Sequence, residues 1–195
     1  MNVNIILFDE FETLDAFGPA QIFGRVPEHF HINYLSENGG IISSSQGAGI
    51  WTEELWPEEI SDVLIIPGGR GAKRLLYLEK ELLEHIKKSA EMADYCLMVE
   101  NGSAILAQTG LLYRRKIADY SYDENWKRMF TAGIVRIPDI RWMADGKYYS
   151  CSDSFSSIDM SLGVVAELLD IDVAAKIASQ LGYGWDCEEH DGILL

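Results

Sequence analysis

The sequence predicts an α/β fold in which a mostly parallel β-sheet is covered by helices on both faces. Short apolar runs alternate with amphipathic helical stretches along the chain, and this alternation is typical of parallel sheets with crossover helices. Several of the apolar runs are continuous, which indicates strands buried on both faces. The chain has 195 residues, enough for one full core and too few for two ordinary domains. We therefore expect a single domain over residues 1–195.

Hydrophobic periodicity predicts the elements in order. Strands are expected at residues 3–8, 31–36, 62–66 and 97–99, with a Gly/Ser-rich hairpin up to Gly49 and another hairpin within 139–151. Helices are expected at residues 14–24, 79–93, 103–109, 156–169 and 172–181. Gly18 and Pro19 are expected to interrupt the first helix, and Asp172 is expected to cap the last one.

Composition excludes several classes of function. The formal net charge of −15 argues against binding to nucleic acids or to anionic membranes. The N-terminal apolar run is short and has no basic flank, so it predicts a first strand and neither a signal peptide nor a membrane anchor. Cys96, Cys151 and Cys187 form no close pair and no metal-ligand spacing, which favours a reducing cytoplasm. We expect neither a bound metal nor a cofactor.

Three loops that follow strands are candidates for a functional site. They span residues 9–15, 67–71 and 100–103. In a parallel sheet these loops lie together beyond the carboxyl ends of the strands. Gly68 and Gly69 permit a close backbone approach, and the Asn101 amide begins a helix, which favours negative charge. These N–H groups are predicted to form an oxyanion hole; the alternative is that the glycines only make tight turns.

Four segments of the sequence together resemble a known family. They are LDAFGP at 14–19, DVLIIPGGRG at 62–71, AILAQTGLL at 104–112 and SIDMSLGVVAELL at 157–169. In this order they resemble the ThiJ/PfpI superfamily and, within it, the isonitrile (isocyanide) hydratase-like branch. The resemblance covers essentially the whole chain. It implies a flavodoxin-like three-layer sandwich related to class I glutamine amidotransferase domains, assembled as a homodimer, with a cysteine nucleophile at the sharp strand-to-helix turn called the elbow.

The elbow residues depart from this family's pattern. By position, the family's cysteine falls on Glu100, the residue after it on Asn101 and the next glycine on Gly102. The acidic residue that supports the cysteine falls on Asp15. A carboxylate is a poor nucleophile compared with a thiolate, so thiol chemistry is not expected at Glu100. Cys151, which ends a strand beside the implied pocket, is the alternative thiol.

Two interpretations of these carboxyl groups remain open. If Glu100 and Asp15 converge, their like charges favour a shared proton, and the pair could act as general acid and base on a bound water or polar ligand. Alternatively, Glu100 caps the elbow or pairs with Arg70, and the site only binds a ligand. A loose metal site made of oxygen donors is a weaker option, because no histidine lies near in the sequence.

The remaining pocket residues follow from the resemblance. The family's histidine-containing segment falls on residues 118–122, where histidine is absent, and Phe155 adds bulk to a stretch of small residues. The expected pocket-lining residues are Arg70, Tyr120, Tyr122, Cys151 and Phe155. The sequence thus predicts a non-thiol family member that binds a small molecule in the elbow pocket. The alternative is a hydratase or hydrolase that uses Glu100 and Asp15.

Overall fold

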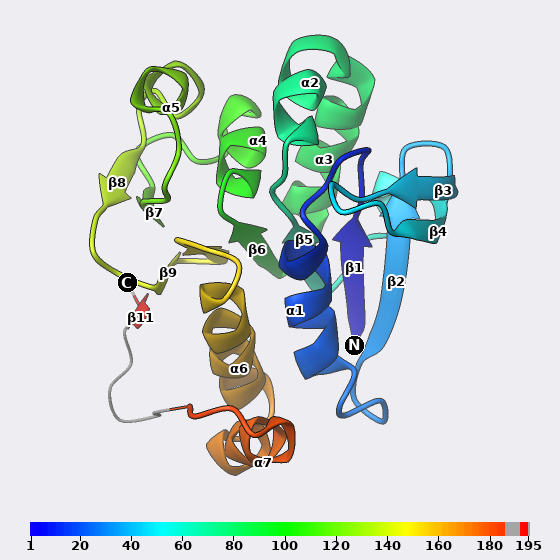
Figure 1. Cartoon of the computed structure of the whole chain (residues 1–195), viewed down its shortest axis with the longest axis vertical. Coiled ribbons are helices and arrows are strands. Elements are labelled where there is room, and N and C mark those ends of the chain that lie inside the picture. The colour runs from blue at the N-terminus through cyan, green and yellow to red at the C-terminus, as the bar shows by residue number, and fades with distance from the viewer. Residues whose placement is uncertain (186–191, 195) are drawn as a thin grey trace.

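A nine-stranded β-sheet between two layers of helices organises the chain (Figure 1). The computed structural model describes residues 1–185 and 192–194, so Cys187 lies outside the described residues. The strands of this sheet are β1 (Asn2–Ile6), β2 (His31–Ser36), β3 (Gly40–Ser43), β4 (Gly49–Glu54), β5 (Val63–Ile66), β6 (Tyr95–Val99), β9 (Trp142–Asp145), β10 (Tyr148–Cys151) and β11 (Gly192–Leu194). A separate small sheet pairs β7 (Lys116–Ala118) with β8 (Val135–Ile137).

The strand order of the large sheet is β11-β9-β10-β6-β5-β1-β2-β4-β3. Neighbouring strands are parallel except in two pairs, β3 with β4 and β9 with β10, which are the two predicted hairpins. The central strands β1, β5 and β6 are almost entirely buried, because helices cover both of their faces. The predicted α/β fold with a mostly parallel sheet is confirmed.

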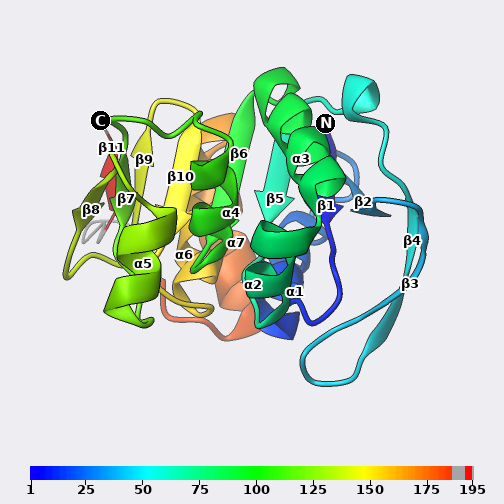
Figure 2. The same cartoon turned by 90° about the horizontal axis from the view of Figure 1, so that it is seen from above.

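Two groups of helices cover the sheet. The described helices are α1 (Thr13–Phe23), α2 (Gly71–Leu78), α3 (Lys80–Met92), α4 (Gly102–Gln108), α5 (Glu124–Phe130), α6 (Ser156–Leu168), α7 (Ile171–Leu181) and the short 3₁₀ helix η1 (Pro57–Glu59). Helices α1, α6 and α7 pack together on one face, and α2 to α5 lie on the other (Figure 2). Among the described residues, no helix combines the length and the apolar character needed to cross a membrane.

Two details of the predicted helices are wrong. Helix α1 continues through Gly18 and Pro19. A Cβ at Gly18 would lie 2.9 Å from the Ser157 hydroxyl, so glycine lets α1 approach α6 closely, and this packing supports a helix that proline by itself would weaken. The cap of α7 is Asp170 and not Asp172, because the Asp170 carboxylate accepts the N–H of Asp172 at 2.8 Å.

The loops after β1, β5 and β6 meet at the carboxyl edge of the sheet, as predicted. Phe11, in the first loop, forms an antiparallel bridge with Gly69 and a parallel bridge with Ser44. The Glu12 N–H donates to the carbonyl of Gly68 at 2.8 Å. The first loop is therefore fastened to the glycine loop by its backbone, and this contact brings α1 to the elbow.

Candidate functional site

The elbow is a sharp turn between β6 and α4, and Glu100 occupies it. Its φ of +46° lies in the left-handed region, which is costly for a residue with a side chain. The turn is held from both sides. The Glu100 N–H donates to the Cys151 carbonyl at 3.2 Å, and the Ser103 hydroxyl donates to the Glu100 carbonyl at 2.6 Å. The chain therefore keeps a strained elbow with a carboxylate at its tip.

The Glu100 side chain is partly buried and has no cationic partner among the described residues. The Ser154 hydroxyl donates to its Oε1 at 3.4 Å. Burial raises the pKa of Glu100, hydrogen bonding by Ser154 lowers it, and the charge of Asp153 raises it. Arg70 is exposed, and its guanidinium donates to the Ser45 carbonyl at 3.5 Å. The predicted alternative of a Glu100–Arg70 salt bridge is therefore wrong for this structure.

Asp15 is the most perturbed carboxyl group of the site. It is fully buried on α1; its Oδ2 accepts the Gly68 N–H at 3.0 Å, whereas its Oδ1 has no hydrogen-bond partner of ordinary geometry. Burial raises the pKa of Asp15 to about 7, the nearby Ser154 hydroxyl lowers it, and the charge of Glu100 raises it. Removal from water is thus the main reason for a retained proton, and the charge of Glu100 is a smaller cause.

Ser154 links the two carboxyl groups, and it is not among the site residues that the sequence predicts. Its hydroxyl bonds Glu100 and also affects the pKa of Asp15. The signal in the sequence is the stretch of small residues before α6, where Phe155 is the bulky exception. Phe155 is 67% exposed, so it lies on the surface of the chain and does not fill the pocket.

The glycine loop approaches the elbow closely, but its amides are already bonded. The Gly68 N–H donates to the Asp15 carboxylate. The Gly69 N–H donates to Oδ1 of Asn101 at 2.9 Å, and the Asn101 side-chain amide donates back to the Gly69 carbonyl at 3.1 Å. A Cβ at Gly102 would lie 2.4 Å from a carbonyl of β5. The predicted oxyanion hole therefore does not have free donors at Gly68 and Gly69; these amides position Asp15 and Asn101.

Cys151 lies beside the elbow but offers no reactive thiolate. Its side chain is 1% exposed, and the thiol donates to the carbonyls of Asp153 at 3.5 Å and Met98 at 3.8 Å. Burial raises the pKa of Cys151 well above its ordinary value, and the charge of Asp15 raises it as well. Since the thiolate is the nucleophilic form, Cys151 does not replace a thiol at position 100.

The two predicted pocket tyrosines lie between β7 and α5 and contact one another. Tyr120 is buried and Tyr122 is partly exposed; their ring centroids are 6.4 Å apart. Trp126, on α5, packs against Tyr122 with a centroid distance of 4.5 Å. Trp126 belongs to this aromatic group and, like the two tyrosines, follows the segment in which the resemblance implies pocket-lining residues.

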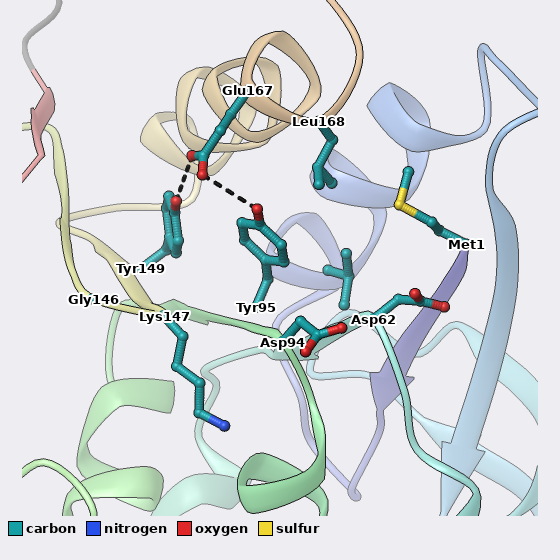
Figure 3. Close-up of a pocket in the computed structure, with 10 residues that line it drawn as sticks. Met1, Asp62, Asp94, Tyr95, Gly146, Lys147, Tyr149, Glu167 and Leu168 are labelled. Atoms are coloured by element: carbon teal, nitrogen blue, oxygen red, sulfur yellow. Dashed lines mark hydrogen bonds between the residues drawn. The ribbon is translucent and has the colours of Figure 1, made fainter.

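A separate cavity of about 500 Å³ lies at the amino ends of β5, β6 and β10, on the opposite edge of the sheet (Figure 3). There the hydroxyls of Tyr95 and Tyr149 point at the Glu167 carboxylate and donate to it at 3.2 and 2.5 Å. The Lys147 ammonium donates to two backbone carbonyls. Because this carboxylate and this lysine are bonded within the chain, we place the candidate site at the elbow.

Comparison with known proteins shows the family to which the chain belongs. The sequence pattern of the DJ-1/PfpI family matches residues 1–167. The chain therefore belongs to the DJ-1/PfpI family, and the predicted ThiJ/PfpI membership is confirmed.

Two curated relatives and two solved structures illustrate the family. The chain is 25% identical over 185 residues to isonitrile hydratase of Pseudomonas putida, covering 94% of this chain and 78% of the relative. It is 28% identical over 155 residues to a deglycase of Pyrococcus abyssi, covering 77% of this chain and 89% of the relative. A ThiJ/PfpI family protein of Pseudomonas syringae has a TM-score of 0.83 at 22% identity, with 95% and 76% of the two chains covered. DJ-1 of Toxoplasma gondii has a TM-score of 0.75 at 21% identity, with 94% and 99% covered.

Proposed function

We propose that this family member binds a small molecule at the elbow and does so without a thiol. The observation that carries the proposal is the Asp15 carboxyl group, which is fully buried, has one oxygen without a hydrogen bond of ordinary geometry and has a pKa of about 7. A buried polar atom without a partner is costly, and a ligand donor at Oδ1 removes that cost. Glu100 offers a second, partly buried carboxyl group beside it.

The thiol is absent from this proposal for two reasons. Position 100, where the resemblance puts the family's nucleophile, holds a glutamate. Cys151 is buried and protonated. The chain is then a divergent family member whose elbow has become a receptor for a polar ligand. We also propose that the chain forms a single domain over residues 1–195 and acts as a homodimer in the cytoplasm. The proposal includes no nucleic-acid partner and no cofactor.

A second candidate function is hydration or hydrolysis of a small substrate by the same two carboxyl groups. It is favoured by the pKa of Asp15, because a general acid or base works best when its pKa is near the working pH. With an isonitrile, one carboxyl group would protonate the terminal carbon while the other removes a proton from the attacking water. At that point the first group is ionised and the second is protonated. The second group then protonates the nitrogen while the first takes the hydroxyl proton, so the net reaction adds one water molecule, gives the formamide and returns both carboxyl groups to their starting protonation states.

Position 100 variants separate the two candidates. Wild type, Glu100→Cys and Glu100→Gln are assayed with cyclohexyl isonitrile and with methylglyoxal. For a pure binding protein we expect no turnover by wild type, and Glu100→Cys restores turnover if the pocket still accepts the substrate. For the carboxylate mechanism we expect wild-type turnover, reduced by about 10²- to 10⁴-fold in Glu100→Gln, which cannot exchange a proton.

Glu100→Cys is a suitable test because cysteine, like glutamate, has a side chain and bears the same φ strain. Ser154→Ala is a further variant of the site, since it removes the hydroxyl that lowers the pKa of both carboxyl groups and leaves the groups themselves in place. Equal turnover by wild type and Glu100→Gln would contradict the carboxylate mechanism. The binding proposal is tested by measuring thermal midpoints of wild type and Asp15→Asn with a panel of small amides, amines and aldehydes. If no compound changes the midpoint of either protein, the binding proposal is wrong.

A further inference from the structure

The cavity at the amino ends of β5, β6 and β10 carries three carboxylates that no cation of the described residues neutralises (Figure 3). They belong to Asp62, Asp94 and Glu167, and none of the three forms an ion pair within the part of the chain that the structure describes. The cavity has a volume of about 500 Å³ and lies on the edge of the sheet opposite to the elbow. Charges of one sign that line one cavity attract a ligand of the opposite sign.

The two positive groups beside this cavity are bound to backbone oxygen atoms. The Lys147 ammonium donates to the carbonyls of Glu91 at 3.1 Å and Ala93 at 2.7 Å, and its side chain leads away from the two tyrosines in Figure 3. The Met1 ammonium donates to the His29 carbonyl at 2.7 Å. Even when both cations are counted against the three carboxylates, one negative charge remains in the cavity.

Glu167 forms the first negative end of the cavity. Tyr149 and Tyr95 each donate to one of its carboxylate oxygens, and each oxygen can accept a further hydrogen bond. Glu167 lies in the last turn of α6, which has no basic residue, and a negative charge at a helix C-terminus is unfavourable. Burial raises the pKa of Tyr95, and the charges of Glu167 and Asp94 raise it further, with no positive group acting against them. A cation at this end would relieve the negative potential.

Asp62 and Asp94 form the second negative end. They are neighbours, because the Asp94 N–H donates to the Asp62 carbonyl at 2.9 Å. Oδ2 of Asp62 accepts the Asn2 N–H at 2.8 Å, whereas its Oδ1 and the Asp94 carboxylate accept no hydrogen bond from the described residues. These oxygens are therefore available to a donor from outside the chain.

The wall between the two ends is largely apolar. Figure 3 places Tyr95 between Glu167 and the two aspartates, and Val63 and Leu168 also line the cavity. An aromatic ring beside carboxylates is a favourable contact for an ammonium group. The described residues contain no group of three histidine, cysteine or acidic side chains that could hold a metal ion, so the cavity favours an organic cation. An apolar wall with a negative group at each end matches a ligand with an apolar middle and a cation at each end.

We propose that this cavity binds a linear aliphatic diamine, with one ammonium group at Glu167 and the other at Asp62 and Asp94. The methylene chain of the ligand contacts the Tyr95 ring and Leu168. Each ammonium group has three donors, which match the carboxylate oxygens left available at the two ends. The site involves neither Glu100 nor Asp15, so it is independent of the function proposed at the elbow.

The first test measures binding of 1,4-diaminobutane by calorimetry at low salt. We expect Glu167→Gln and Asp94→Asn each to weaken binding by about 5- to 10-fold, because each removes one charged hydrogen-bond acceptor. Both side chains are exposed, so these variants are expected to fold. Glu84→Gln, at an exposed position of α3 outside the cavity, removes the same charge and should bind as wild type does. No binding by wild type, or an equal loss in all three variants, would overturn the proposal.

The second test varies the ligand. We expect 1-aminobutane, which has one ammonium group, to bind at least about 5-fold more weakly than 1,4-diaminobutane, and the neutral 1,4-butanediol not to bind. Equal affinity for the monoamine and the diamine would show that the cavity does not have two binding ends, and tighter binding of Mg²⁺ would show that it is a metal site. Either result rejects the diamine.

The third test separates the Tyr95 ring from its hydroxyl. Tyr95→Phe keeps the aromatic face, so we expect it to bind 1,4-diaminobutane within about 2-fold of wild type. Tyr95→Leu removes that face and should weaken binding by about 3-fold. If Tyr95→Phe loses as much affinity as Tyr95→Leu, the ring does not contact the ligand and the proposed pose is wrong.

Discussion

Asp15→Asn is expected to stabilise the protein at pH 8 by up to about 4 kcal/mol, because burial raises the pKa of Asp15 from 3.8 to about 7. In the unfolded chain this carboxyl group ionises near its ordinary pKa, whereas the folded protein holds the proton until about pH 7. The stability of wild type therefore falls as the pH rises through that interval and is then constant. Asparagine does not ionise, and its side-chain oxygen can still accept the Gly68 N–H.

Urea unfolding at pH 4, 6 and 8 measures this difference in the free energy of unfolding. The difference between Asp15→Asn and wild type should be small at pH 4 and largest at pH 8. Asp145→Asn is the control, because its effect on the free energy of unfolding should have the opposite sign. Burial raises the pKa of Asp145, but the Lys116 N–H and the ion pair with Arg115 lower it by more, so the pKa lies below its ordinary value. Its replacement should destabilise the protein at pH 8. A constant difference for Asp15→Asn across the three pH values would show that Asp15 ionises normally.

Gly69→Ala is expected to destabilise the protein by about 3 to 5 kcal/mol and to abolish ligand binding at the elbow. Gly69 has a φ of +137°, and a Cβ there would lie 2.4 Å from the carbonyl oxygen of Glu10 and 2.6 Å from the backbone nitrogen of Glu12. Both contacts are with backbone, which cannot rotate away. The first loop would have to move, and Asp15 would move with it.

Gly47→Ala separates backbone strain from the steric clash. Gly47 also has a positive φ, +86°, but no atom lies within 4 Å of a Cβ built there. We expect it to destabilise the protein by only about 1 kcal/mol, and to leave the site unchanged. Thermal and urea unfolding of both variants provide the comparison. If the two losses are equal, the close contact between the first loop and the glycine loop does not contribute to stability.

The strands and the meeting of the loops could be predicted because they depend on local pattern. Continuous apolar runs such as residues 63–66 indicate burial on both faces, and parallel strands bring their carboxyl ends to one edge. Helices α2 and α5 have 8 and 7 residues, too few turns for a periodic signal. Helix α1 continues through Pro19 because it packs against α6, and a contact between two separate helices cannot be predicted from the local sequence pattern of either one.

Part of the candidate site could also be predicted, and the remainder could not. Position 100 and Asp15 follow from their places in the motifs. The roles of Gly68 and Gly69 were predicted differently, because their amides were expected to face a ligand and instead bind side chains. Tyr120 and Tyr122 follow from the resemblance, whereas the contact of Ser154 with Glu100 joins residues 54 positions apart, and no local pattern predicts it.

The sequence by itself determined that a carboxylate stands at the elbow, that Asp15 accompanies it, and that the fold is a parallel α/β sheet. These properties depend on residue type and on order along the chain. The tertiary structure alone decided that Asp15 keeps a proton near neutral pH, that the Cys151 thiol is inert, and that Ser154 lies beside both carboxyl groups. Those properties depend on how far each group is removed from water and on atoms brought near from distant segments, as Gly68 is brought to Asp15 across 53 residues.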